Sequence, residues 1–247
     1  MDPALPFVRP YRIRFDEAGA DGLVRPSALV RYLQDLAWQH SEAAGFDRAW
    51  YTAHGWGWLV RGLELELRGT TGYGDTLSVS TRITGWRRMW CRRLTEITSA
   101  AGDPVARARI DWVLLDMTGR PVRIPAEIEA FAPGAETFTP VRVDLPVPPS
   151  DAVVVASAVR TADIDPMAHL NNAAYLDLVA EAALACDRPA GAGTTLRLEY
   201  LQPALPGMAL TLTAWPTGPS LAVRLRETGG SADLLRATVD PTPSVAP

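Results

Sequence analysis

The sequence contains no lysine, only two cysteines and no long apolar segment. Its 24 basic residues are therefore all arginines, and its 28 acidic residues give a formal net charge of −4. This charge excludes a strongly basic nucleic-acid-binding protein. Two cysteines, Cys91 and Cys186, are too few for a disulfide framework or a zinc site. No stretch approaches the ~18 apolar residues of a membrane span, and residues 1–10 do not read as a signal peptide, so a cytoplasmic location is expected.

The composition is that of an ordinary globular protein. Apolar residues make up 47% of the chain and charged residues 21%, which is enough to bury a core without disulfides or metals. The length of 247 residues lies between one domain and two. Composition therefore leaves the number of domains to the pattern along the chain.

The hydrophobic period of the first half predicts one extended segment, one helix and four strands. Residues 8–15 alternate loosely. From Ser27 to about Ala44 the period is helical, with Ser27 as the expected N-cap and Gly45 as the expected end. In the first strand, Leu59, Leu63, Leu65 and Leu67 are expected on one face. The four strands are expected at 59–67, 77–83, 87–98 and 105–116.

The same order of elements returns after residues 131–150, a stretch with five prolines that is expected to be a linker. An extended segment at 153–164 is followed by a helix at 172–186 and strands at 194–202, 208–215, 220–227 and 233–239. The sequence L-E-L-E-L at 63–67 also aligns with L-R-L-E-Y at 196–200, an offset of 133. The chain therefore reads as two copies of one unit.

The predicted fold class is α+β, with an antiparallel sheet wrapped around one buried helix in each unit. The predicted divisions are an N-terminal repeat at 1–130, the linker at 131–150, a C-terminal repeat at 151–240 and a tail at 241–247. The two repeats are expected to share one sheet and to fold as one body.

The densest polar cluster lies just before the second helix. Asp165, His169, Asn171 and Asn172 fall within eight residues, and Glu181 follows on the helix itself. The first N–H groups of a helix can hold an oxyanion, a carboxylate can attack or activate water, and histidine can move a proton. The alternative is purely local: Asn172 as the N-cap, Asp165 as a turn former and Glu181 in solvent.

The segment D-I-D-P-M-A-H-L-N-N-A-A-Y-L, at 163–176, resembles the signature of hotdog-fold acyl thioesterases. Together with L-V-R-Y-L-Q-D-L-A-W-Q-H, W-G-W-L-V-R-G-L-E-L-E-L and L-E-Y-L-Q-P-A-L-P-G-M, it resembles the acyl-acyl-carrier-protein thioesterase family over about residues 8–240. The resemblance implies a tandem (double) hotdog that hydrolyses fatty acyl thioesters on acyl carrier protein or coenzyme A.

The resemblance also assigns site residues. It places the catalytic carboxylate at Asp165 and the histidine at His169. Plant members carry an asparagine where this chain has Met167 and a glutamate where it has Pro203. The second polar group is therefore open among Asn171, Asn172 and Glu181, and the first helix is expected to supply a wall.

Candidate substrate-binding residues lie in the first unit. Arg87, Arg88, Arg92 and Arg93 alternate with tryptophans. They fit either a solvated strand face or a dock for an acidic carrier protein or coenzyme A phosphates. Trp56 and Trp58 are expected to line an acyl tunnel or to pack in the core. His40 is expected to be a core histidine.

Two other functions remain open at this stage. One is a hotdog hydratase or dehydratase acting on enoyl thioesters, and the other is a module that binds acyl chains or a carrier protein without catalysis. No cofactor, metal or nucleic acid is expected. The internal pseudo-dimer is compatible with a monomer or a homodimer.

Overall fold

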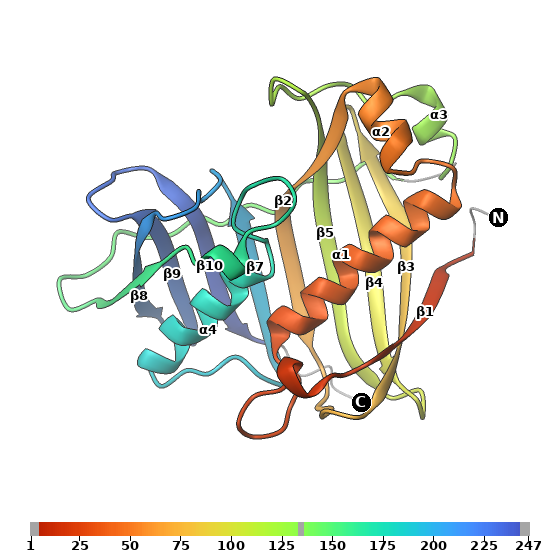
Figure 1. The fold of residues 1–247 in the computed structure, drawn as a ribbon. Coiled ribbons are helices and arrows are strands. Elements are labelled where there is room, and N and C mark those ends of the chain that lie inside the picture. Colours follow the sequence, from red (N-terminus) through yellow and green to blue (C-terminus); the bar gives the residue numbers. More distant parts are fainter. Residues whose placement is uncertain (1–4, 133–135, 243–247) are drawn as a thin grey trace.

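A computed structural model describes residues 5–132 and 136–242, and Figure 1 shows its ribbon. The first half of the chain forms a β-meander interrupted by helices. Its elements in chain order are β1 (Phe7–Arg12), a 3-10 turn (Phe15–Glu17), α1 (Pro26–Ala43), α2 (Arg48–His54), β2 (Trp56–Leu67), β3 (Thr76–Arg87), β4 (Trp90–Ser99), β5 (Pro104–Asp116) and α3 (Ala126–Glu129).

The second half repeats this order without the two short helices. Its elements are β6 (Val153–Ala158), a 3-10 turn (Thr161–Asp163), α4 (Ala174–Ala185), β7 (Thr194–Tyr200), β8 (Ala209–Thr217), β9 (Ser220–Glu227) and β10 (Asp233–Pro241). Each predicted strand and both predicted helices are therefore present. The predicted strand at 77–83 extends to residue 87 because the β3–β4 hairpin turns only after Arg87.

All ten strands belong to one antiparallel sheet, in the order β1-β3-β4-β5-β2-β7-β10-β9-β8-β6. Equivalent strands of the two repeats lie at equal distances from the centre of the sheet: β1 corresponds to β6, β3 to β8, β4 to β9, β5 to β10 and β2 to β7. The repeats meet where β2 pairs with β7, and there Glu64 lies opposite Arg197, its counterpart at the offset of 133. The axis that relates the two repeats therefore passes through this pair.

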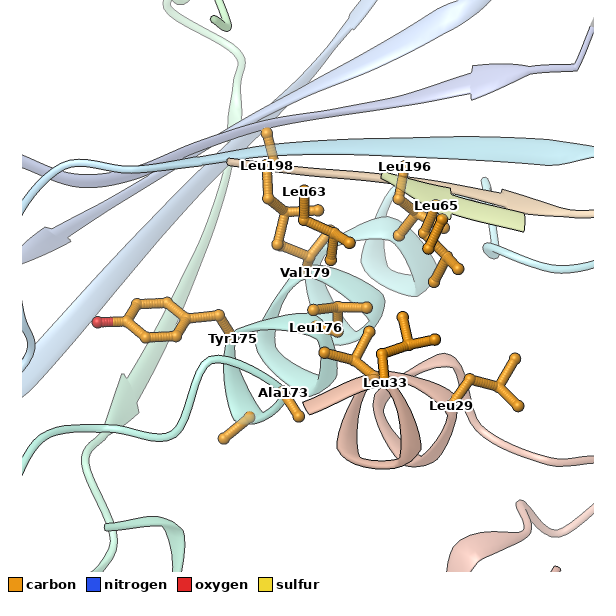
Figure 2. Packing of buried hydrophobic residues seen from close by; sticks show 14 of the residues in the cluster. Leu29, Leu33, Leu63, Leu65, Ala173, Tyr175, Leu176, Val179, Leu196 and Leu198 are labelled. Atoms are coloured by element: carbon orange, nitrogen blue, oxygen red, sulfur yellow. The ribbon is translucent and has the colours of Figure 1, made fainter. Parts of the chain in front are cut away.

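The two long helices lie on the same side of the sheet, and α1 contacts α4 (Figure 1). Figure 2 shows side chains of both helices pointing toward leucines of the central strands. Leu33 of α1, Leu176 of α4 and Leu65 of β2 are all buried, and Leu196 of β7 joins them in one cluster. Burial of each such side chain stabilises the fold by roughly 1.5–3 kcal/mol. This is the tandem hotdog architecture that the sequence predicted.

Two local expectations are wrong. A β-bulge between Val60 and Gly62 inserts one residue into β2, so Val60 instead of Leu59 joins Leu63 in the core. Ser27 does not cap α1, because Pro26 occupies the first helical turn and Arg25 is the N-cap.

The segment after Glu136 crosses the face of the sheet opposite the helices. The N–H of Val141 donates to the Asp111 carboxylate (2.7 Å), and the N–H of Val143 donates to Glu199 (3.0 Å). These carboxylates alternate with the core residues Ile110 and Leu198, so they point away from the helices. The segment thus forms hydrogen bonds with both repeats on the same face of the sheet. None of the helices in the described residues is long and apolar enough to cross a membrane, and the cytoplasmic location stays a prediction.

Candidate active site

A cavity of about 1250 Å³ opens between the two units. The second unit contributes the loop that carries Asp165 and His169, together with the start of α4. The first unit contributes residues of α1, α2 and β2 and the inner face of the β3–β4–β5 sheet. Because the polar loop belongs to one repeat and most of the wall to the other, the cavity exists only when the repeats pack together.

The Asp165 loop is a tight three-residue hairpin. The N–H of Asp165 donates to the carbonyl of His169 (2.9 Å), and the N–H of Ala168 donates back to Asp165 (2.9 Å). Ala168 has a φ of +61°, the left-handed position that closes such a loop and costs a residue with a side chain about 1–2 kcal/mol. The loop therefore holds Asp165 and His169 beside each other in a fixed backbone.

The Asp165 carboxylate is held by the same loop. Its Oδ1 atom accepts from the N–H groups of Met167 (2.9 Å) and His169 (3.4 Å). Among the described residues, neither Oδ2 of Asp165 nor the His169 ring has a hydrogen-bond partner, although both residues line the cavity. One carboxylate oxygen and one imidazole are thus available to a bound molecule.

The start of α4 lies next to this loop. The N-cap of α4 is Ala173 and not Asn172, and Oδ1 of Asn171 accepts from the N–H of Ala173 (2.9 Å). The N–H of Asn172 has no partner among the described residues. Asn172 lies two residues before the first residue of α4. A helix start carries partial positive charge, so this N–H is a candidate donor to an oxyanion.

Gln34 of α1 joins the two repeats at the helix start. Its amide nitrogen lies 3.4 Å from Oδ1 of Asn171, and its carbonyl oxygen accepts from the amide of Asn172 (3.3 Å). Tyr200 of β7 holds the Asn172 carbonyl from the other side (3.1 Å). The two asparagines are therefore oriented by groups from both units.

The sequence did not single out several other cavity residues as candidates. Gln202 and Arg61 line the cavity near the Asp165 loop, and Arg61 donates to the carbonyl of Leu201 (2.8 Å). Burial raises the pKa of Tyr175 to about 12 and that of Tyr200 well above its ordinary value, so both hydroxyls stay neutral. Arg61 is more than 100 residues before the other three in the sequence, and the β2–β7 pairing brings it to them.

Much of the remaining cavity wall is apolar. Trp56 and Trp58 both line the cavity, and the indole N–H of Trp58 donates to the Tyr51 hydroxyl (2.8 Å). Tyr51 comes from α2, one of the two short helices that the hydrophobic period did not predict. A helix of two turns gives too few periodic positions to be recognised.

The structure separates the four arginines of the β3–β4 hairpin. Arg87 and Arg88 are exposed and line a second pocket of about 320 Å³ with Arg142. Arg92 binds Asp111 through two hydrogen bonds (2.7 and 2.8 Å) on the outer face of the sheet. Arg93 is buried and lines the large cavity. The four residues therefore do not form one surface.

Glu181 lies apart from the other predicted site residues. It is exposed on α4, two turns beyond the helix start, and it is not among the residues that line the cavity. Within residues 5–132 and 136–242, no three side chains of the histidine, cysteine, aspartate or glutamate types are grouped so that they could hold a metal ion.

The continuous sheet, the two buried helices and the cavity between the repeats define a tandem hotdog protein. Comparison with known proteins gives the same class. The acyl-ACP thioesterase N-terminal domain matches residues 5–131, and the acyl-ACP thioesterase C-terminal domain matches residues 149–217. The chain belongs to the acyl-ACP thioesterase family.

Individual relatives are distant. The chloroplastic palmitoyl-acyl carrier protein thioesterases of Gossypium hirsutum and Arabidopsis thaliana are each 25% identical over 208 residues, 74% of this chain. The chain spans about half (48%) of the length of these curated relatives.

Two solved structures share the fold over nearly the whole chain. An acyl-ACP thioesterase from Bacteroides thetaiotaomicron has a TM-score of 0.78 at 17% identity and covers 95% of this chain and 97% of its own. The 12:0-ACP thioesterase from Umbellularia californica has a TM-score of 0.77 at 20% identity, with coverages of 95% and 96%.

Proposed function

We propose that this protein hydrolyses fatty acyl thioesters carried on acyl carrier protein, releasing the free fatty acid. The observation that supports this most directly is the cavity itself. One region holds a carboxylate, an imidazole and a free backbone N–H just before α4, and much of the remaining wall is apolar and aromatic. The polar groups can act on a thioester carbonyl, and the apolar wall can hold an acyl chain. Membership of the acyl-ACP thioesterase family supports the same reaction.

In the proposed mechanism Asp165 acts as general base. Its free oxygen takes a proton from water, and the hydroxide attacks the thioester carbonyl carbon. The N–H of Asn172 and the start of α4 hold the resulting oxyanion. The intermediate then expels the thiolate, and the proton passes to this sulfur through His169. A direct attack by the carboxylate, followed by hydrolysis of the anhydride, uses the same residues.

Positioning is the proposed role of the two asparagines. Asn171 fixes the turn before α4 by accepting from the N–H of Ala173, and Asn172 is fixed through Gln34 and Tyr200. Met167 and Pro203, which stand where plant members carry polar residues, both line the cavity. Gln202 lies directly beside Pro203 and is exposed to the cavity. We therefore add Gln202 to the candidates for the second polar group, and Glu181, which lies outside the cavity, is left out.

Carrier docking is proposed for the exposed arginines. Arg87 and Arg88 are exposed cations on a net-acidic chain, whereas Arg142, which lines the same pocket, is already paired with the Glu199 carboxylate. Arginine binds carboxylates and phosphates through paired hydrogen bonds. An acidic carrier protein is the partner that we propose. Arg92 is excluded from this role because Asp111 and the carbonyl of Thr139 already occupy its guanidinium.

The deciding experiment compares the wild type with Asp165→Asn. The amide keeps a side-chain oxygen for the N–H groups of Met167 and His169, so the loop should fold, but the amide cannot act as a base. We expect thiol release from acyl-ACP and acyl-CoA to fall by about a hundredfold or more, with unchanged circular dichroism. Asp177→Asn on α4, the helix that follows the Asp165 loop, changes a carboxylate that faces Arg31 outside the cavity. It is the matched control and should retain full activity.

Incubation of the wild type with saturated and 2-enoyl thioesters separates the alternative functions. Loss of enoyl absorbance without thiol release would identify a hydratase. Tight acyl-thioester binding with no thiol released over hours would identify a binding module. Wild-type rates in Asp165→Asn would contradict the proposed mechanism.

A further inference from the structure

Arg93 of β4 is a buried cation without an anionic partner. Its exposed fraction is 9%, and one guanidinium nitrogen lies 2.8 Å from Nδ1 of His40 on α1. No carboxylate of residues 5–132 or 136–242 lies within 4 Å of it, although its neighbour Arg92 has two hydrogen bonds to Asp111. A buried charge is costly unless it is paired, so this guanidinium needs an explanation.

His40 does not supply the missing charge. Burial, and secondly the positive charge of Arg93, lower the pKa of His40 to about 4, so the imidazole is neutral near pH 7. Its Nδ1 atom accepts from Arg93, and its ring packs against Phe7 and Phe131. Burial also lowers the pKa of the Arg93 guanidinium. The histidine therefore orients Arg93 and satisfies one donor, but it leaves the charge unpaired.

The rest of Arg93 faces the large cavity. Arg93 lines it together with Ile83, Trp86, Cys91 and Phe131, which are apolar or aromatic side chains. The charge is therefore in contact with the same chamber that the proposed function assigns to the acyl chain. Among the described residues, that part of the wall offers the guanidinium no acidic group.

Helix α1 shows that Arg93 lies away from the reacting carbonyl. Gln34 contacts the asparagines at the catalytic end, whereas His40 contacts Arg93. Six residues of α-helix separate these positions, a rise of ~9 Å along the axis. An acyl chain with its carbonyl at Asp165 would therefore approach Arg93 with its distal part.

We propose that Arg93 selects acyl chains that carry an oxygen acceptor, and a carboxylate above all, at the end distant from the thioester. This inference rests on the proposed function, because it assigns the cavity to the acyl chain. A methyl end would displace water from the guanidinium without accepting a hydrogen bond from it, so the free energy of desolvation would not be offset. A terminal carboxylate pairs with it through charge-assisted hydrogen bonds, and a hydroxyl or keto oxygen does so more weakly.

The test measures kcat/KM on acyl thioesters of matched medium chain length that end in a methyl, a hydroxyl or a carboxylate group. For the wild type we expect the carboxylate-ended chain to exceed the methyl-ended one by about tenfold or more. Arg93→Met replaces the guanidinium with an apolar side chain and should reverse this order. Arg82→Met, at an exposed arginine of the adjacent strand that does not line the cavity, should leave the order unchanged.

A binding measurement separates this inference from the proposed reaction. Methyl laurate and monomethyl dodecanedioate differ only at the distal end and need not be hydrolysed. If no thioester is cleaved but the wild type still binds the dodecanedioate ester more tightly, with Arg93→Met losing the preference, the inference stands and the proposed hydrolysis fails. Equal binding of the two esters to the wild type, or equal turnover of the three chain ends, would overturn the inference.

Discussion

Arg92 and Arg93 are neighbours in β4, yet their side chains have opposite surroundings. Successive residues of a strand point to opposite faces of the sheet. Arg92 therefore meets Asp111 and the crossing segment, and Arg93 meets His40 and the cavity. Removing one member of a buried pair such as Arg92–Asp111 costs about 3–5 kcal/mol. The sequence shows four arginines in seven residues, but the sheet gives them three different roles.

His40 should make stability depend on pH. The pKa of a histidine in an unfolded chain is ~6.5, whereas in the folded protein burial lowers that of His40 to about 4. The unfolded chain binds more protons between these values, so this contribution is complete above pH 6.5 and is lost as the pH falls toward 4. The loss is about 3 kcal/mol.

The variant His40→Gln tests this dependence, because glutamine keeps an acceptor for Arg93 but does not titrate. Urea unfolding between pH 7 and pH 4 should show the wild type losing about 3 kcal/mol more than the variant. Carboxylates titrate in both proteins and cancel in the difference. Parallel pH curves for the two proteins would contradict a buried, neutral His40.

At the scale of elements, length decided which features the sequence could predict. Both long helices and eight of the strands were predicted from their hydrophobic patterns, and β1 and β6 were expected as extended segments. The helices Arg48–His54 and Ala126–Glu129 are too short for a period and were missed. The N-cap expected at Ser27 was wrong, because Arg25 takes that position. The alternative of Asn172 as an N-cap was also wrong, because Ala173 is the N-cap of α4.

The segment that crosses the sheet depends on two glycines that lie beside β-bulges. At Gly85 of β3, a Cβ atom would lie 2.9 Å from the carbonyl oxygen of Glu136, and at Gly62 of β2 it would lie 2.8 Å from Cβ of Val141. Each glycine therefore allows the segment to approach the backbone of the sheet. Their φ angles are ordinary, so close approach is the reason for glycine at both places.

Gly85→Ala should therefore destabilise the protein. Glu136 exchanges backbone hydrogen bonds with Thr84 (3.0 Å) and Trp86 (3.1 Å) on either side of this glycine, so the added methyl group cannot be accommodated without a shift of backbone. We expect a loss of about 1–3 kcal/mol in the free energy of unfolding, measured by urea titration. Gly191→Ala, where a Cβ atom would meet nothing within 4 Å, is the control. Equal stabilities of the two variants would contradict the close approach.

At the scale of the whole molecule, the two repeats share a sheet, a core and a crossing segment. Glu64 pairs with Arg197 across the β2–β7 junction (2.9 Å), and residues of both halves belong to one hydrophobic cluster. At this junction neither half has a free sheet edge or a separate core, because β2 pairs with β7 and the cluster contains residues of both halves. The repeats should therefore unfold together.

Cooperative unfolding can be followed with two probes. Seven of the eight tryptophans lie before residue 131, whereas circular dichroism reports on the strands of both halves. We expect coincident urea transitions by tryptophan fluorescence and by circular dichroism, and one calorimetric peak. A fluorescence transition that separates from the dichroism transition would show that the first repeat unfolds by itself.

The sequence by itself determined the long helices, the strands, their order and the duplication, because hydrophobic periods and the offset of 133 can be read directly from the order of residues. It also marked the loop of Asp165 and His169, since these residues are neighbours in the chain. Only the tertiary structure decided what surrounds them. Gln34, Arg61 and Gln202 reach the site through the packing of α1 on α4 and of β2 on β7.

The pairing of β4 with β3 and β5 decided which face of the sheet each hairpin arginine occupies. The bulge between Ile83 and Gly85 sets the register of β3 against β4, and Arg93 lies opposite Ile110 on the core side. Burial, pairing and access to a cavity depend on contacts between segments that are far apart in the sequence. For that reason the sequence alone predicted a site, but only the tertiary structure shows that Arg92 is paired and that Arg93 has no anionic partner among the described residues.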